Sequence, residues 1–226
     1  MLKNIKYYAI IKMLYGKYIK MFGGKAVMGV MNLEFREPRR YEVIGGKIYF
    51  MASPATNHNR IINNLIRLFG DFLEGKKCTV FGENVDVYLD EKNREVKPDL
   101  KIVCDPSKIT EKNIVGAPDL IVEVLSRYNA DHDRITKMEL YQKFGVKEYW
   151  IINIPNREVE VYLLKDGKFV FDKRYGVFTE EEINEVENDP GELESTKEFV
   201  RRRDIKTSIF GDDLLIPTEK IFRNLI

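Results

Sequence analysis

Two carboxylates lie in apolar runs of strand length near the middle of the chain. Asp99 opens the run 100–103, and Glu123 lies between Val122 and Val124 in a second run. Short apolar runs without alternation are typical of strands that are buried on both faces. An ionised carboxylate in such a strand is costly unless a cation or a metal ion pairs with it. These two acids are therefore the first candidates for a functional site.

The same two acids suggest a metal site. Side chains alternate in direction along a strand, so two neighbouring strands can direct Asp99 and Glu123 to one side of a sheet. Two carboxylates that converge with a main-chain carbonyl suit Mg²⁺ or Mn²⁺. Such an ion binds a phosphate oxygen and lowers the pKa of bound water. We therefore predict that Asp99 and Glu123 are metal ligands and that the chemistry is hydrolysis of a phosphodiester bond.

A lysine on the next helix can supply the cation that such hydrolysis needs beside the attacked phosphorus. Lys137 lies early in a predicted helix over residues 134–144, and Tyr141 follows one turn later on the same face. A helix that follows a strand packs back over it, so we expect Lys137 to reach Glu123. His58 and Glu83 are further candidates for a supporting or phosphate-binding role.

Each of these side chains also has a structural interpretation, which the sequence leaves open. Asp99 can accept hydrogen bonds at the start of a strand, and Glu123 can form an ion pair with Lys137 or Arg134. Lys137 can be an ordinary solvated helix lysine. Asp119, which follows a proline, is typical of a residue that caps a turn, and we do not predict it as a ligand.

Periodicity and turn residues predict the elements that position these side chains. Strands over 41–44 and 47–50 flank Gly45-Gly46, a strong hairpin signal. Apolar residues at helical spacing predict a helix over 53–74, capped by Thr56 or Asn57 and closed by Gly75. The other predicted elements are strands over 79–81, 85–89 and 148–153, a hairpin of 158–164 and 168–174, and a terminal helix over 218–226. This order predicts an α/β domain with a mixed central sheet flanked by helices.

Two charged segments stand apart from this core. Residues 1–31 carry six lysines and no acidic residue, and the spacing from Tyr7 to Tyr18 predicts a basic amphipathic N-terminal helix. We treat residues 1–31 as an extension and 32–226 as the domain. Within the domain, residues 179–205 are predicted to be an exposed charged insertion, in which the run from Arg201 to Arg203 balances a glutamate-rich stretch.

Composition limits the function classes. The 226 residues suit one sizeable domain, and 37 Lys and Arg against 36 Asp and Glu give a net charge of +1. Any nucleic-acid partner therefore needs a local basic patch. Cys78 and Cys104 have no metal-ligand spacing or disulfide framework, so we expect buried free thiols in a reducing cytoplasm. No apolar run approaches the ~20 residues of a membrane span.

The chain also resembles a known family. Pro98-Asp99 followed by Glu123 in a second apolar strand resembles the PD-(D/E)xK nuclease superfamily and, more closely, the Uma-two family of restriction-endonuclease-like proteins. The resemblance covers about residues 35–175 and 205–226. The matching landmarks are Met51-Ala52-Ser53-Pro54 with His58, Lys97-Pro98-Asp99-Leu100, the run from Pro118 to Ser126, Asp133 with Lys137, the run from Tyr141 to Trp150, and the segment from Thr207 to Ile216.

The resemblance implies a restriction-endonuclease-like core and a Mg²⁺-dependent (or Mn²⁺-dependent) nuclease site acting on DNA. Asp99 and Glu123 would be the metal ligands and Lys137 the catalytic lysine. The superfamily's usual lysine, two residues after the glutamate, is replaced here by Leu125. A catalytically inactive nucleic-acid-binding or protein-interaction module on the same fold is therefore the alternative. Cleavage of both DNA strands would favour a homodimer.

Overall fold

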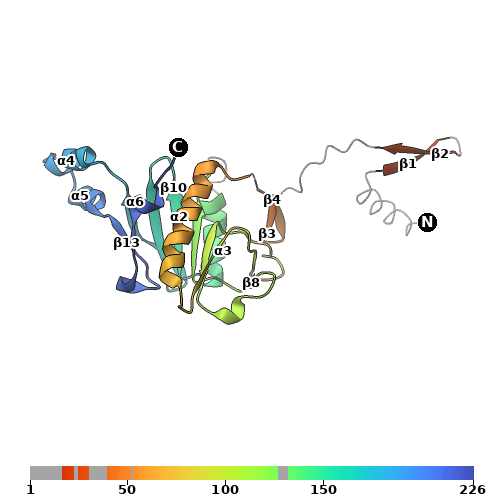
Figure 1. Cartoon of the computed structure of the whole chain (residues 1–226), viewed down its shortest axis with the longest axis horizontal. Helices are drawn as coiled ribbons and strands as arrows, with labels where there is room; N and C mark the ends of the chain where they lie inside the picture. Colours follow the sequence, from red (N-terminus) through yellow and green to blue (C-terminus); the bar gives the residue numbers. More distant parts are fainter. Residues whose placement is uncertain (1–16, 23–24, 31–39, 52, 127–131) are drawn as a thin grey trace. The chain divides into compact units, whose positions relative to one another are not determined.

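A six-stranded mixed sheet forms the centre of the unit Arg40–Ile226 (Figure 1). The computed structural model describes residues 17–22, 25–30, 40–51, 53–126 and 132–226. The strand order is β12-β11-β10-β9-β7-β5, and only β9 and β10 run parallel. Its strands are β5 (Thr79–Gly82), β7 (Leu100–Val103), β9 (Leu120–Val124), β10 (Glu148–Asn153), β11 (Glu158–Lys165) and β12 (Lys168–Gly176). The predicted α/β class with a mixed central sheet is confirmed.

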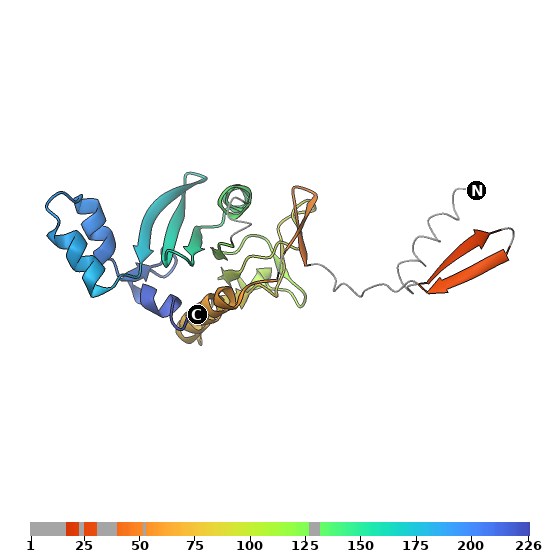
Figure 2. The same ribbon diagram turned by 90° about the horizontal axis from the view of Figure 1, so that it is seen from above.

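Helices cover both faces of this sheet, as Figure 2 shows from above. Helix α2 (Thr56–Leu73) packs its apolar stripe, including Ile61, Leu65 and Phe69, against the face that carries Trp150. Helix α3 (Met138–Phe144) packs Leu140 and Tyr141 against the opposite face. The central strands β7, β9 and β10 are therefore buried on both sides, which explains their continuous apolar sequences.

The helix boundaries correct two details of the sequence prediction. The N-cap of α2 is Ala55, which makes no side-chain cap, and Asn57 instead hydrogen-bonds the backbone of Ile226. The segment predicted as one helix over 134–144 starts as a π-helix, η2 (His132–Lys137), and continues as α3. A π-turn places Lys137 differently from a regular helix turn. Gly145 ends α3 in the left-handed conformation.

A short hairpin lies at the start of the unit. Strands β3 (Tyr41–Ile44) and β4 (Lys47–Phe50) pair around Gly45-Gly46, as predicted. The hairpin is fixed by backbone bonds from Val43 to Arg94 and from Gly46 to Lys92. Strands β6 (Val87–Tyr88) and β8 (Ile114–Val115) form a second small sheet, and η1 (Pro106–Lys108) is a 3-10 turn.

The charged segment 179–205 forms two helices joined by a turn. Ile183 of α4 (Glu180–Asn188) and Phe199 of α5 (Glu194–Arg201) are buried, and the rest is largely exposed. Arg201 pairs with Glu187 and Glu194, so the charge balance expected for this segment is present. The chain then continues through β13 (Asp204–Lys206), η3 (Gly211–Asp213), β14 (Leu215–Pro217) and α6 (Thr218–Ile221).

The unit Met1–Arg39 contains an antiparallel pair, β1 (Lys17–Phe22) and β2 (Lys25–Val30). The amphipathic helix predicted between Tyr7 and Tyr18 lies outside the described residues except for Lys17 and Tyr18, which belong to β1. No helix within the described ranges has the length and apolar character required to cross a membrane.

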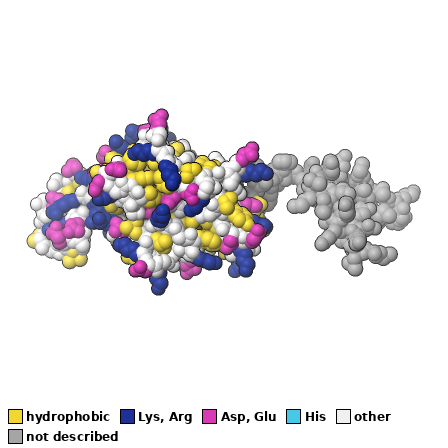
Figure 3. All heavy atoms as spheres, turned by 90° about the horizontal axis from the view of Figure 1, so that it is seen from below, with side chains coloured by type: hydrophobic (Ala, Val, Ile, Leu, Met, Phe, Trp, Pro, Cys, Tyr) yellow, Lys and Arg dark blue, Asp and Glu magenta, His cyan; other side chains and the backbone are white. Residues whose placement is uncertain are grey.

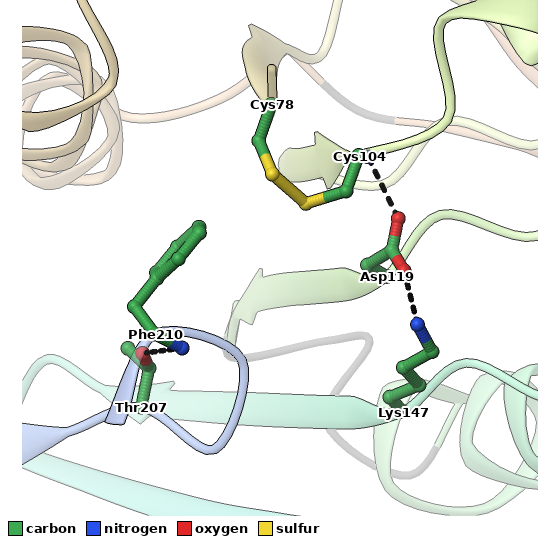
Figure 4. The surroundings of a disulfide bond; sticks show 6 residues. All are labelled: Cys78, Cys104, Asp119, Lys147, Thr207 and Phe210. Carbon is green, nitrogen blue, oxygen red and sulfur yellow. Dashed lines mark hydrogen bonds and ion pairs between the residues drawn. A yellow bond between two sulfur atoms is a disulfide. The ribbon is translucent and has the colours of Figure 1, made fainter. Parts of the chain in front are cut away.

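The prediction of two free cysteines is wrong. Cys78 and Cys104 form a disulfide (Figure 4). The register of β5 and β7 pairs Thr79 with Val103, so the next position along each strand places the two cysteines opposite each other. They are 26 residues apart in sequence and lie next to each other just beyond the ends of the paired strands. The inference of a reducing compartment, which depended on free thiols, loses that support.

Candidate active site

The sheet register places Asp99 and Glu123 side by side. Strands β7 and β9 are antiparallel, with Leu100 opposite Val122 and Lys101 opposite Ile121. The next pair along the same register is Asp99 with Glu123. Residues directly opposite each other in a sheet project to the same face. The structure thus brings together the two acids that the sequence singled out, and both are buried, at 6% and 1% exposure.

Asp99 is held through one of its two oxygens. Its Oδ2 lies 3.0 Å from His58 Nε2 and accepts the backbone N–H of Val124 at 2.7 Å. Burial opposes ionisation, but the hydrogen bond and charge of His58 outweigh it and hold the pKa of Asp99 below its usual value. No residue in the described ranges donates a hydrogen bond to Oδ1. His58, on α2, therefore supports Asp99.

Glu123 is also held through only one of its two carboxylate oxygens by the described residues. Its Oε1 accepts hydrogen bonds from Lys137 Nζ at 3.0 Å and from the Tyr141 hydroxyl at 2.7 Å. Its Oε2 receives no hydrogen bond from the described part of the chain. Burial, assisted by neighbouring carboxylates, raises the pKa of Glu123 well above its usual value, and Lys137 opposes this rise. The expected approach of Lys137 to Glu123, with Tyr141 one turn later, is present.

Lys137 is surrounded by three carboxylates. Besides Glu123, its Nζ lies 3.5 Å from Asp133 Oδ1 and 3.6 Å from Glu42 Oε1. Burial alone would lower the pKa of Lys137, but these carboxylates outweigh burial and raise it well above its usual value. Lys137 is therefore a fixed positive charge rather than a solvated helix lysine.

Two charged groups of the site were missed by sequence reasoning. Glu42 lies on β3, is 2% exposed, and also contacts His132 Nε2 at 3.0 Å. Lys101 lies on β7 and is completely buried on the same sheet face as Asp99 and Glu123. Burial lowers the pKa of Lys101 to about 8, and its Nζ donates a hydrogen bond to the carbonyl of Pro98 at 3.3 Å.

A cavity of about 500 Å³ opens onto the two predicted metal ligands and the predicted catalytic lysine. Its lining includes Asp99, Glu123, Lys137 and His58, together with Asp133. Glu83, the remaining candidate from the sequence, also lines the cavity, but its carboxylate is engaged by Arg40 at 2.8 Å. Asp119 lies elsewhere, where it accepts the backbone N–H of Cys104 and pairs with Lys147 (Figure 4).

Two carboxylates of the site are placed where a divalent cation could bind. Among the described residues, no group of three or more His, Cys, Asp or Glu side chains is placed to hold a metal ion. Mg²⁺, however, usually binds one or two carboxylates and keeps several waters or phosphate oxygens. No described residue donates a hydrogen bond to Asp99 Oδ1 or Glu123 Oε2, so both oxygens are available to such an ion. The residues present therefore fit a two-carboxylate site.

The charge balance agrees with this fit. The buried cluster contains four carboxylates, Glu42, Asp99, Glu123 and Asp133, and two lysines, Lys101 and Lys137. When these six groups are all ionised, four negative charges against two positive charges leave two in excess. One divalent cation would neutralise this excess. Burial is the main cause of the raised pKa of Glu123, and the neighbouring carboxylates add to it.

Comparisons with known proteins agree on the family and the fold. A family model, Uma2, described as "Putative restriction endonuclease", matches residues 30–193. Two proteins of Synechocystis sp., "Uncharacterized protein slr1290" and "Uncharacterized protein sll1609", are 28% and 29% identical over 60% and 58% of this chain and 72% and 76% of their own.

A solved structure, described as a "putative nuclease belonging to DUF820" from Anabaena variabilis, aligns with a TM-score of 0.56. The alignment covers 80% of this chain and 89% of that one at 18% identity. At this identity the likeness shows the fold alone.

Proposed function

The chain belongs to the Uma2 family, and from this premise we propose that it is a Mg²⁺-dependent endonuclease that hydrolyses phosphodiester bonds of DNA. One observation carries the proposal. Asp99 and Glu123 occupy opposite positions of β7 and β9, and the ammonium of Lys137 lies 3.0 Å from Glu123 at the wall of a cavity. Two acids that can hold a divalent cation, with an ammonium beside them, can stabilise the charge that develops during phosphodiester hydrolysis.

In this proposal Asp99 and Glu123 would hold the divalent cation. When bound, the ion supplies a Lewis acid for a phosphate oxygen and lowers the pKa of a bound water. His58 fixes the orientation of Asp99, and Tyr141 fixes that of Glu123. Mn²⁺ suits the same oxygen ligands and would substitute for Mg²⁺.

Lys137 contributes charge rather than proton transfer. An ammonium whose pKa is raised well above its usual value keeps its proton near neutral pH. It therefore stabilises negative charge that develops on the phosphate. Because three carboxylates fix its position, little rearrangement is needed as the reaction proceeds.

Cleavage of supercoiled plasmid tests the proposal. The purified full chain is incubated with plasmid and Mg²⁺ or Mn²⁺, and the same assay is run with Asp99→Asn, Glu123→Gln and Lys137→Met. Asp119→Asn is the matched control, because Asp119 is a buried acid that precedes β9 as Asp99 precedes β7. We expect losses of at least about 100-fold in the three site variants and near-normal cleavage by the control.

Cleavage that persists in the Asp99 and Glu123 variants would rule out this site. Binding of DNA without cleavage under any divalent cation would favour the inactive binding module instead. We further propose that a homodimer presents two such sites to duplex DNA, and light scattering of the purified chain measures its oligomeric state.

A further inference from the structure

An arginine–carboxylate pair forms part of the cavity wall beside the candidate site. Arg40 Nη1 and Nη2 donate hydrogen bonds to the two oxygens of Glu83 at 3.3 and 2.8 Å. Both residues line the cavity, and the Arg40 side chain is 31% exposed. The pair therefore combines fixed geometry with access to solvent.

The other cations of the cavity are already committed. Among its described lining residues the basic ones are Arg40, His58 and Lys137. Lys137 is enclosed by three carboxylates and His58 is bound to Asp99. On the face seen in Figure 3, acidic and basic side chains are interspersed without a broad area of one sign. A polyanion that enters this acid-rich cavity thus has Arg40 as the accessible cation at its wall.

The contact that Arg40 makes is one that a phosphate can replace. A guanidinium binds carboxylate and phosphate through the same pair of parallel N–H bonds. The Glu83 carboxylate therefore occupies the position that two non-bridging phosphate oxygens would take. The pair is partly exposed, and exchange of one anion for another at such a pair has little net cost.

The backbone fixes Arg40 relative to the candidate site. The carbonyl of Arg40 accepts the N–H of Met51 at 2.7 Å, at the base of the β3–β4 hairpin. Two residues later in the chain, Glu42 contacts Lys137. The hairpin thus connects Arg40 to a residue that contacts the candidate catalytic lysine.

We propose that Arg40 binds a non-scissile phosphate of the nucleic acid and that Glu83 occupies the guanidinium until the substrate displaces it. The identity of the ligand as a nucleic acid rests on the proposed function, in which DNA is the substrate. Arg40 sets the position of the nucleic-acid backbone. Glu83 lowers the affinity for DNA because it competes with the phosphate for the Arg40 guanidinium.

DNA binding measured without cleavage tests this role. A labelled 30-base-pair duplex is titrated with the full chain in Ca²⁺ at several salt concentrations, for wild type, Arg40→Gln, Arg40→Lys and Glu83→Gln. The control pair is Arg134 and Glu160, which has the same two-bond geometry and similar exposure but does not line the cavity. Thermal unfolding confirms that each variant is folded.

We expect Arg40→Gln to weaken binding about tenfold and to reduce the salt slope by about one, because one phosphate contact is lost. Arg40→Lys should keep the slope and lose part of the affinity, and Glu83→Gln should bind several-fold more tightly. Arg134→Gln and Glu160→Gln should bind as wild type does. Unchanged affinity and slope in Arg40→Gln, or equal changes in Arg40→Gln and Arg134→Gln, would overturn the proposal.

The two proposals fail separately in these assays. A chain that binds DNA through Arg40 but cleaves nothing would contradict the nuclease and leave the phosphate site standing. If the chain cleaves plasmid and Arg40→Gln leaves DNA binding unchanged, the nuclease is supported and the phosphate site is contradicted. Absence of any DNA binding would overturn the Arg40 site.

Discussion

Lys137 Nζ lies 3.0 Å from Glu123 Oε1, and the two side chains are only 4% and 1% exposed. Ion pairs in such a place are costly to form because both charges lose their hydration. Here the lysine also lies close to Glu42 and Asp133, so it holds together carboxylates from three parts of the chain. The pair therefore ties the stability of the fold to the arrangement of the candidate site.

The first prediction concerns the stability that depends on this lysine. Lys137→Met leaves three buried carboxylates without their shared cation, and we expect the free energy of unfolding to fall by about 3–5 kcal/mol. Lys147→Met is the control, because Lys147 pairs with Asp119 at 2.7 Å while its side chain is 67% exposed. There we expect less than about 1 kcal/mol. Urea unfolding measures both; equal losses would mean that Lys137 is not the organising charge.

A second prediction concerns Lys101, whose pKa burial lowers to about 8. Below that pH the folded protein contains a poorly solvated ammonium, so we expect Lys101→Met to be more stable than wild type at pH 7, by about 1–3 kcal/mol.

The lowered pKa of Lys101 also determines how the free energy of unfolding changes with pH. Between pH 8 and the usual lysine value of 10.5, the unfolded chain keeps a proton that the folded chain has lost. Wild-type stability therefore rises with pH in this window, and the advantage of the variant shrinks. A Lys101→Met variant that is less stable than wild type at pH 7 would show that Lys101 is favourably paired instead.

The third prediction follows from the contact between His58 and Asp99. Burial alone would lower the pKa of His58, but the hydrogen bond and charge of Asp99 raise it above 6.5. The stabilisation from protonated His58 is fully present below pH 6.5 and is lost as the pH rises through the raised value. We expect His58→Gln to lose more stability at pH 5.5 than at pH 8.5.

Nuclear magnetic resonance separates this effect from simple loss of packing. The His58 ring signal should titrate at a higher pH in wild type than in Asp99→Asn, in which the charge is removed and the shape is kept. Identical titration midpoints in the two proteins would contradict the predicted coupling.

The disulfide gives a fourth prediction. A link between Cys78 and Cys104, 26 residues apart, restricts the unfolded chain, and we expect its reduction to lower the free energy of unfolding by about 3 kcal/mol. The double variant Cys78→Ala/Cys104→Ala should resemble the reduced protein and ignore reductant. Two reactive thiols per chain in the denatured, unreduced protein would show that the disulfide is absent.

The centre of the site could be predicted from the sequence because each acid stands out from the apolar residues next to it in the chain. Carboxylates inside apolar strands are costly wherever they occur, so Asp99 and Glu123 could be identified without coordinates. Lys137 followed from the rule that a helix packs over the preceding strand. The roles of these residues as ligands and catalyst stay predictions.

The rest of the cluster depends on tertiary placement that no local pattern encodes. Glu42 looks like an ordinary hairpin residue until the hairpin docks beside η2, and Lys101 looks like a solvated strand lysine. Prediction of the disulfide would have required knowledge of the register between β5 and β7. Once that pairing is assumed, the positions of Cys78 and Cys104 immediately outside the two strands become a usable signal.

Calorimetric titration of Mn²⁺ into the purified chain tests the central claim most directly, because it measures the ion rather than its consequences. We predict that wild type and Asp119→Asn bind an ion with equal affinity and that Asp99→Asn and Glu123→Gln bind it at least about tenfold more weakly, since each loses a charged ligand. Equal affinity in wild type, Asp99→Asn and Glu123→Gln would contradict a metal site between these two carboxylates.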